Sequence, residues 1–210
     1  MSRVIVSAHL DDAVLSAFSA LVPGTTVVTV FCGTPPAGSL APWDAESGAV
    51  DSAVRVAERC VEDQRALAGL AEVVHLELAD EQYVDAGLMP APGAAAIAKA
   101  LGPYLDADEL YVPAALDNTD HLRVRDAILA VRSQVTLYAD LPYALRCGFG
   151  DDAGAVDVTL DDVQVTAKLA AVRAYATQLE ILERGFGAFV TKAGLGRERF
   201  WPRPRAALPR

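Results

Sequence analysis

The 210-residue chain is 52% hydrophobic and carries a formal net charge of −10 at pH 7. A chain of this size and composition can bury one sizeable core, so we expect a single domain over residues 1–210. The acidic balance argues against a nucleic-acid binder, because such proteins need a basic surface to displace counterions. The apolar stretches fall short of the roughly 18 residues of a membrane span, so we expect no membrane partner.

The predicted elements alternate between strand and helix along the chain. We predict strands at 4–7, 25–31, 73–78, 110–113 and 135–138, helices at 12–21, 52–70, 94–101, 122–131 and 161–182, and a short edge strand within 151–160. This order predicts an α/β fold of Rossmann-like type, with a mostly parallel sheet and helices on both faces. The loop 34–51 is too long for an idle connection, and we expect it to contribute to a site.

The chain ends and the cysteines support further expectations. The start enters a strand without a signal-peptide pattern, which predicts a cytoplasmic protein. Cys32, Cys60 and Cys147 are odd in number and widely spaced, which favours reduced core residues over disulfides or metal ligands. The segment 190–210 is rich in arginine and proline, and we expect an extended arm that packs on the acidic body or on a partner subunit. Whether the chain forms a homo-oligomer stays open.

Two of the three histidines lie in acidic clusters directly after predicted strands. His9 is followed by Asp11 and Asp12, and His121 follows Asp120. Carboxyl ends of parallel strands form ligand crevices, so both clusters can meet there. Two imidazoles, a carboxylate and one open position make up the ligand set of a catalytic zinc site, and a second carboxylate is then available as a base. The alternative is that the aspartates only cap the following helices.

The third histidine has a simpler interpretation. His75 alternates with apolar residues in a predicted strand, which favours a hydrogen-bonded or surface-facing side chain over a metal ligand.

These residues resemble the motifs of the PIG-L/LmbE-like family of zinc-dependent N-deacetylases. The family motif AHPDDE corresponds to AHLDDA at 8–13, and its HPDH or HVDH motif corresponds to NTDH at 118–121. Further resembling segments follow in the family's order: PWD at 42–44, R-x-x-E-D at 59–63, YADLPY at 138–143, K…Y-x-x-Q at 168–178 and ERFW at 198–201.

The resemblance implies a role for each matching position. It implies that His9, Asp12 and His121 bind Zn²⁺ or Fe²⁺ and that Asp11 is the general base. Asn118 replaces a family histidine; its amide can donate a hydrogen bond to an oxyanion but cannot carry a proton. Other residues expected to contact the substrate or support the ligands are Asp120, Asp140, Tyr143 and Trp43.

The expected function is a metal-dependent amidohydrolase that removes an acetyl or similar acyl group from an amine. The substrate is a small N-acylated metabolite, such as a sugar or secondary-metabolite intermediate. Val84 stands where sugar-handling members carry an arginine, which argues against a simple N-acetylglucosaminide. The alternative, motivated by Asn118, is a metal- and ligand-binding relative that has lost hydrolysis.

Overall fold

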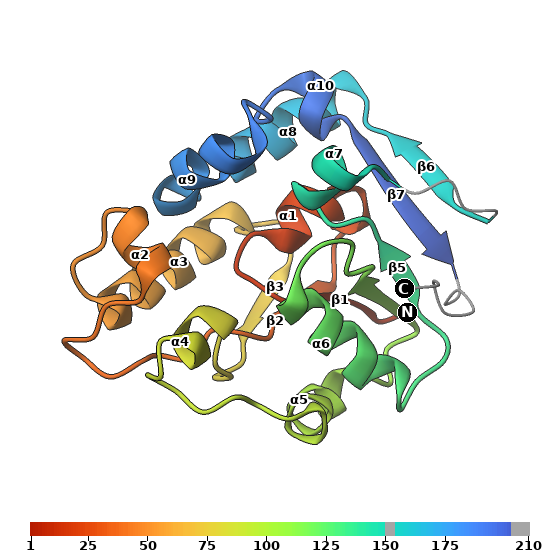
Figure 1. Cartoon of the computed structure of the whole chain (residues 1–210). Helices are drawn as coiled ribbons and strands as arrows, with labels where there is room; N and C mark the ends of the chain where they lie inside the picture. Colours follow the sequence, from red (N-terminus) through yellow and green to blue (C-terminus); the bar gives the residue numbers. More distant parts are fainter. Residues whose placement is uncertain (150–153, 203–210) are drawn as a thin grey trace.

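A computed structural model describes residues 1–149 and 154–202, and these residues contain one mixed sheet. Its strands are β1 (Arg3–Ser7), β2 (Thr25–Thr29), β3 (Glu72–His75), β4 (Glu109–Pro113), β5 (Thr136–Tyr138), β6 (Val156–Thr159) and β7 (Arg197–Pro202). The strand order is β3-β2-β1-β4-β5-β7-β6 (Figure 1). Strands β1 to β5 are mutually parallel, whereas β7 is antiparallel to both β5 and β6. The prediction of a mostly parallel sheet is confirmed.

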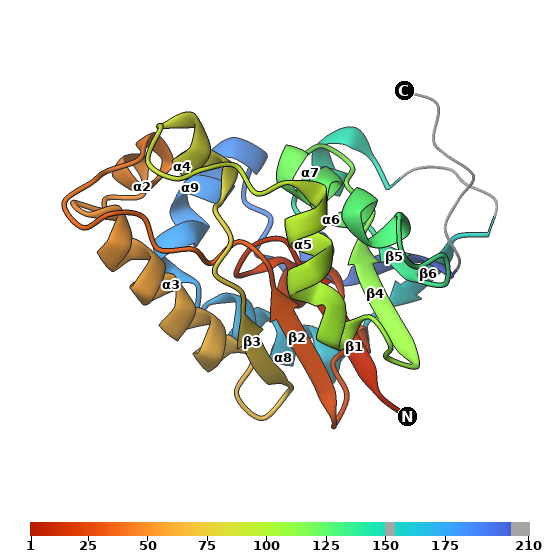
Figure 2. The ribbon, with the colours of Figure 1, turned by 90° about the horizontal axis from the view of Figure 1, so that it is seen from below.

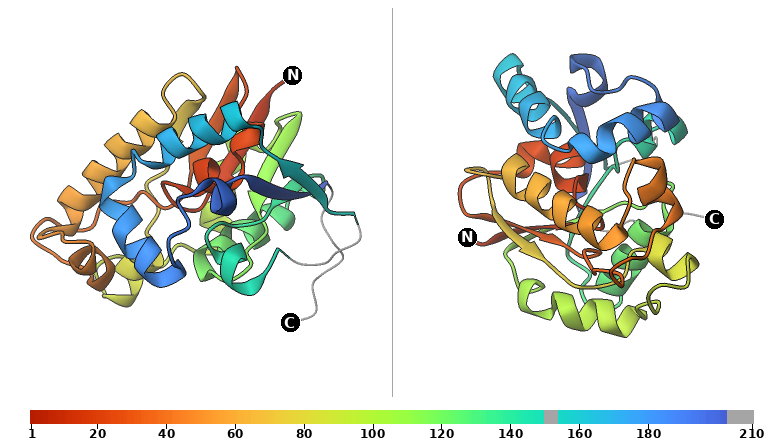
Figure 3. Two further views of the ribbon diagram at one scale, coloured as in Figure 1. Left: turned by 90° about the horizontal axis from the view of Figure 1, so that it is seen from above. Right: turned by 90° about the vertical axis from the view of Figure 1, so that its left-hand side faces the viewer.

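Helices cover both faces of this sheet, as predicted. They are α1 (Asp12–Ser16), α2 (Pro42–Glu46), α3 (Ser52–Ala66), α4 (Glu81–Asp85), α5 (Ala94–Leu101), α6 (Thr119–Leu129), α7 (Tyr143–Cys147), α8 (Asp162–Val172), α9 (Ala176–Phe186) and α10 (Lys192–Leu195), with short 3₁₀ turns at Phe18–Ala20 and Gly102–Tyr104. Helices α5 and α6 lie on one side and α1, α3, α8 and α9 on the other (Figures 1 and 3). Together these layers form a single α/β domain.

Strand β1 is an interior strand of the sheet, between β2 and β4. Its apolar run Val4–Val6 is at most 6% exposed, as a parallel strand covered on both faces should be. The chain leaves β1 toward β2 on one side and later returns to β4 on the other (Figure 2). Such a reversal leaves a crevice at the carboxyl ends of the two diverging strands. The fold therefore places a crevice directly after Ser7 and Pro113.

The first predicted helix, at 12–21, is shorter than expected. Helix α1 ends at Ser16, and a 3₁₀ turn follows. The carboxylate of Glu198 accepts hydrogen bonds from the backbone N–H groups of Phe18 and Ser19, at 2.8 and 2.9 Å. Because these two donors point at a side chain from β7, they do not continue the helical ladder.

The predicted helix at 161–182 is two helices, α8 and α9. Tyr175 lies between them, is 1% exposed, and donates its hydroxyl to Asp63 of α3 at 2.7 Å. Its backbone ψ of 50° is outside the helical region. The anchored tyrosine turns the chain so that both helices pack against α3. Tertiary packing therefore overrides a continuous helical pattern.

The expectation of a C-terminal arm is wrong for residues 197–202. This segment is β7, an internal strand between β5 and β6, while residues 203–210 lie outside the described part of the chain. Arg197 and Arg199, which suggested an arm, instead form ion pairs with Asp157 of β6 at 2.9 and 2.7 Å. Strand β6 confirms the predicted edge strand.

The expectations for the cysteines are confirmed only in part, and the expectation for His75 is confirmed. All three cysteines have free thiols, but only Cys32 is buried; Cys60 is half-buried and Cys147 is exposed, so the prediction of core positions is wrong for Cys147. His75 pairs with Asp63 at 2.8 Å, as expected for a hydrogen-bonded histidine. No helix among the described residues is long and apolar enough to span a bilayer.

A buried ion pair holds the C-terminal layer to the sheet. The Lys168 ammonium donates to the Glu198 carboxylate at 2.6 Å, and both side chains are fully buried. We expect Glu198→Gln to lower the free energy of unfolding by about 3–5 kcal/mol, because it leaves a buried ammonium uncompensated. Urea denaturation measures this. Glu180→Gln, which removes an exposed pair with Arg184, is the control and should change stability by less than about 1 kcal/mol. A loss below about 1 kcal/mol in Glu198→Gln would contradict the assignment.

Candidate functional site

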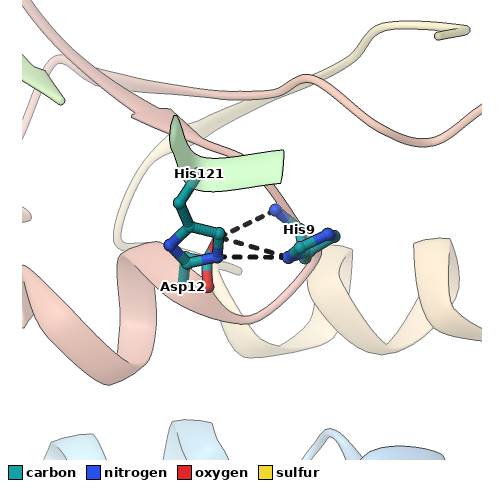
Figure 4. Close-up of side chains that lie close together, drawn as sticks. All are labelled: His9, Asp12 and His121. Carbon is teal, nitrogen blue, oxygen red and sulfur yellow. Dashed lines mark hydrogen bonds and ion pairs between the residues drawn. The ribbon is translucent and has the colours of Figure 1, made fainter. Parts of the chain in front are cut away.

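The crevice after β1 and β4 holds a compact cluster of metal-ligand side chains. His9 and Asp12 follow β1, and His121 lies in the first turn of α6, after β4. One ring nitrogen of each histidine and one carboxylate oxygen lie within 4.8 Å of one another (Figure 4). His121 Nε2 is 3.2 Å from His9 Nδ1 and 3.3 Å from Asp12 Oδ2. The three predicted ligands are therefore brought together.

Two further carboxylates orient the histidine rings. His121 Nδ1 bonds to Asp140 Oδ1 at 3.0 Å, which leaves Nε2 directed at the cluster. His9 Nε2 lies 3.3 Å from Asp120 Oδ2, which leaves its Nδ1 directed there. Arg123 donates to Asp120 at 2.8 Å and holds it in place. Outer carboxylates of this kind fix the ring tautomer and strengthen the ligand.

The cluster attracts positive charge. Burial alone would lower the pKa of His121, but Asp12 and Asp140 raise it well above the ordinary value. Burial likewise opposes protonation of His9, and Asp120 and Asp80 raise its pKa. The site therefore favours a proton or a metal cation. Two nitrogens and one carboxylate oxygen suit a divalent ion such as zinc, with a fourth position left for water or substrate.

Asp11 stands beside this cluster with an unengaged carboxylate. It occupies the N-cap position of α1, but its side chain makes no capping hydrogen bond. The cap of α6 is Asn118, not Asp120. Burial raises the pKa of Asp11 to about 6, with a further contribution from Asp12, while Arg59 opposes the shift. The helix-cap alternative therefore does not describe this side chain, and a carboxylate with this pKa can exchange protons near neutral pH.

A cavity of about 310 Å³ opens above the cluster. Its lining includes His9, Asp11, Asp12, Trp43, Arg59, Asp80, Glu81, Gln82, Asp85, Asn118, Asp120, Leu141, Pro142, Tyr143, Gln178 and Leu182. The loop 34–51 reaches this cavity through the short helix α2, where the Trp43 indole N–H donates to Gln178 at 3.0 Å. A wall of the cavity is thus assembled from the loop and from α9.

The side chain of Asn118 makes two hydrogen bonds within the protein, whereas its amide was expected to donate to an oxyanion. Its side-chain oxygen accepts the backbone N–H of His121 at 3.1 Å, and its amide donates to the Tyr143 hydroxyl at 2.8 Å. Burial, followed by the nearby Asp12 and Asp11 carboxylates, raises the pKa of Tyr143 far above its ordinary value, so the hydroxyl stays protonated. Because its oxygen already accepts from Asn118, the Tyr143 O–H is free to donate into the cavity.

Arg59 was not predicted to lie in the site. Arg59 is 7% exposed, lines the cavity, and its Nε has no hydrogen-bond partner. The sequence does contain a pattern that places Arg59 on one face of α3. Arg55, Arg59, Glu62 and Asp63 recur at helical spacing and are all buried. An apolar stripe is the usual mark of a buried helix face, and this face is charged instead. Asp80, Glu81 and Asp85 were also not predicted, because their acidic segment contains no histidine or cysteine that would mark it as a site.

The comparisons with known proteins identify the fold. No family model matches the chain, and no curated protein matches it. Among solved structures, a zinc-inhibited form of the teicoplanin deacetylase Orf2 superposes with a TM-score of 0.79 at 23% identity, over 99% of this chain and 100% of that one. The A40926 pseudoaglycone deacetylase Dbv21 superposes with a TM-score of 0.77 at 25% identity, over 99% of each chain. The chain therefore has the fold of these deacetylases.

The same fold also carries a different reaction. The 4-carboxy-2-hydroxymuconate hydratase GalB from Pseudomonas putida superposes with a TM-score of 0.57 at 17% identity, over 99% of this chain and 98% of that one. Fold alone therefore does not decide the activity, which depends on the side chains of the site.

Metal analysis tests the cluster directly. We expect the purified protein to hold about one zinc per chain, because three protein ligands with an open position are the rule for catalytic zinc. His9→Ala, Asp12→Ala and His121→Ala should each lose most of it, since each removes one of three ligands. His75→Ala, which lies outside the cluster, is the control and should keep it. Full occupancy in any two of the three cluster variants would contradict the site.

Proposed function

We propose that the chain is a metal-dependent N-deacetylase of the PIG-L/LmbE-like family, acting on a small N-acylated amine. One observation carries this proposal: a carboxylate without a capping bond, Asp11, lies beside a three-ligand cluster at the crevice of the sheet. A module that only binds a ligand has no need of such a base. The deacetylase neighbours support the proposal. Zinc is the proposed ion, and the same donors suit Fe²⁺ as well.

The proposed roles are consistent with the positions of the side chains. His9, Asp12 and His121 would hold the ion, which supplies Lewis acidity and lowers the pKa of a bound water. Asp11 takes a proton from the attacking water. The Tyr143 hydroxyl, held by Asn118, donates to the oxygen that becomes negative.

The leaving amine also needs a proton. Asn118 carries none, so Asp11 gives the amine the proton that it took from water. One carboxylate then serves both steps, which suits a group whose pKa lies near 6.

Asp11→Asn tests the base. The amide keeps the size of the side chain but cannot accept a proton, so kcat should fall by about 10²–10⁴. Released acetate, measured over a panel of N-acetylated amines, gives the activity, and zinc analysis of the same preparation is the control. Loss of zinc in parallel with activity would make Asp11 a ligand instead.

The second candidate is a relative that binds metal and ligand without hydrolysis. Asn118, in place of a residue that carries protons, is the observation that favours it. The same acetate screen separates the two functions, because a protein that only binds releases no acetate from any amine that it binds.

A double-variant cycle tests the pair formed by Asn118 and Tyr143. Tyr143→Phe removes the donated hydroxyl and should lower kcat/KM by about 10–10³. Asn118→Ser keeps a helix cap but releases Tyr143. Because both act through one hydrogen bond, the double variant should be no slower than Tyr143→Phe alone. Zinc content is again the control. Additive losses, or full activity in Tyr143→Phe, would show that the hydroxyl does not serve the reacting oxygen.

A further inference from the structure

The candidate active-site cavity adjoins a second hollow, and nearly all the charged side chains that line the two are carboxylates. The second hollow shares Trp43, Gln82 and Asp85 with the first and adds Pro42, Glu46 and Ala86. The acidic residues that line one or both are Asp11, Asp12, Glu46, Asp80, Glu81, Asp85 and Asp120. Arg59 is the one lysine or arginine among the lining residues.

Two inner carboxylates have local partners. Asp12 lies 3.3 Å from His121 in the metal-ligand cluster. Asp120 is paired with Arg123 and also lies within 3.3 Å of His9. These two groups therefore leave little uncompensated charge for a substrate, and Asp11 beside them is the proposed base.

The outer carboxylates form no ion pair among the described residues. Glu46 and Asp85 are exposed. Burial raises the pKa of Glu81, and the charges of Asp120 and Asp85 raise it further, whereas Arg123 opposes the shift. Like charges held this close repel one another until a cation arrives. We call Glu46, Glu81 and Asp85 the acidic rim.

The rim differs from the rest of the acidic surface in position. Elsewhere, some exposed carboxylates pair with arginines, as Asp157 does with Arg197 and Arg199 and Asp117 does with Arg146 at 2.6 Å. Unpaired ones such as Glu72 and Asp106 line neither hollow, whereas no lysine or arginine in the described part of the chain lines the second hollow.

Arg59 gives the cavity a direction. Its buried guanidinium forms no ion pair or hydrogen bond among the described residues, although buried polar groups are normally bonded. A ligand that enters the cavity can supply the missing acceptor. Once the cluster holds a divalent ion, the positive charges of the ion and of Arg59 together repel a cationic group from the inner end of the cavity, and the acidic rim attracts it.

Trp43 connects the two hollows beside this rim. Its indole N–H is engaged by Gln178, and the side chain lines both hollows. An aromatic face flanked by carboxylates attracts ammonium groups through its π electrons and through the nearby charges.

We propose that the substrate is an N-acyl amine with a second, positively charged amino group, which the acidic rim holds beside Trp43 while the acyl group lies at the metal-ligand cluster. This inference rests on the proposed function, because both concern one cavity.

Binding of matched probes to the zinc-loaded protein tests the inference separately from turnover. The probes are N-acetylputrescine, its neutral isostere N-pentylacetamide, and the anionic N-acetyl-4-aminobutyrate. At low salt, calorimetry should show the cation binding about tenfold or more tightly than the neutral probe, and the anion binding most weakly. The preference should shrink as salt screens the charges.

A pair of charge-matched double variants locates the effect. Glu46→Gln/Asp85→Asn should reduce the preference to about threefold or less. Glu72→Gln/Asp106→Asn removes the same charge from exposed positions that line neither hollow, and should leave the preference intact.

The outcomes separate the two proposals. Equal affinities, a preference that survives in the rim variant, or no binding of N-acetylputrescine up to about 10 mM would overturn the inference. Cation preference that depends on the rim supports it, whether or not acetate is released. Acetate release from none of a broad panel would count against the deacetylase function alone.

Discussion

The parallel pairing of β1 with β4 is the constraint on which the site depends. It places His9 Nδ1 and His121 Nε2 3.2 Å apart although 112 residues separate them in the chain. Strand β5, which pairs with β4, brings Asp140 to the outer nitrogen of His121. Neither histidine would be oriented by its own local sequence. The geometry of the candidate ligands is therefore a property of strand order, and a change of register in β4 would displace His121 relative to His9 and Asp140.

The fold was predictable from the sequence because the alternation of strands and helices is a local signal. The ends of helices were less predictable. Side chains from distant strands or helices can bond the backbone N–H groups of a helix, or hold the residue at which one helix ends and the next begins. Glu198 ends α1 early by accepting two N–H groups from 179 and 180 residues away. Tyr175 divides the last long helix through its bond to Asp63. In both cases the deciding partner is remote in the chain, and local propensity contains no information about it.

In the candidate site, too, some residues were predictable from local sequence and others were not. The proximity of His9, Asp12 and His121 was predictable because histidine and aspartate stand close together after strands. Arg59 was not, because a charged face on α3 has the composition of a solvated one, and only the layer of α8 and α9 above it makes it buried. The prediction for Asn118 was incomplete for a similar reason. Its partner Tyr143 follows a different strand, so the hydrogen bond between them exists only in the folded chain.

The C-terminal layer links stability to the shape of the cavity. Lys168 is fixed by Glu198, Tyr175 by Asp63, and Thr177 by Glu62 at 2.7 Å, so α8 and α9 are joined to the body by directional polar bonds as well as apolar packing. Buried polar networks of this kind restrict the register of the elements that they join, since each bond is satisfied in one arrangement. Gln178, in the next position, then holds Trp43. The wall of the cavity thus depends on how firmly α9 is held, and polar anchoring suits a wall that must keep an aromatic side chain in one place beside the metal-ligand cluster.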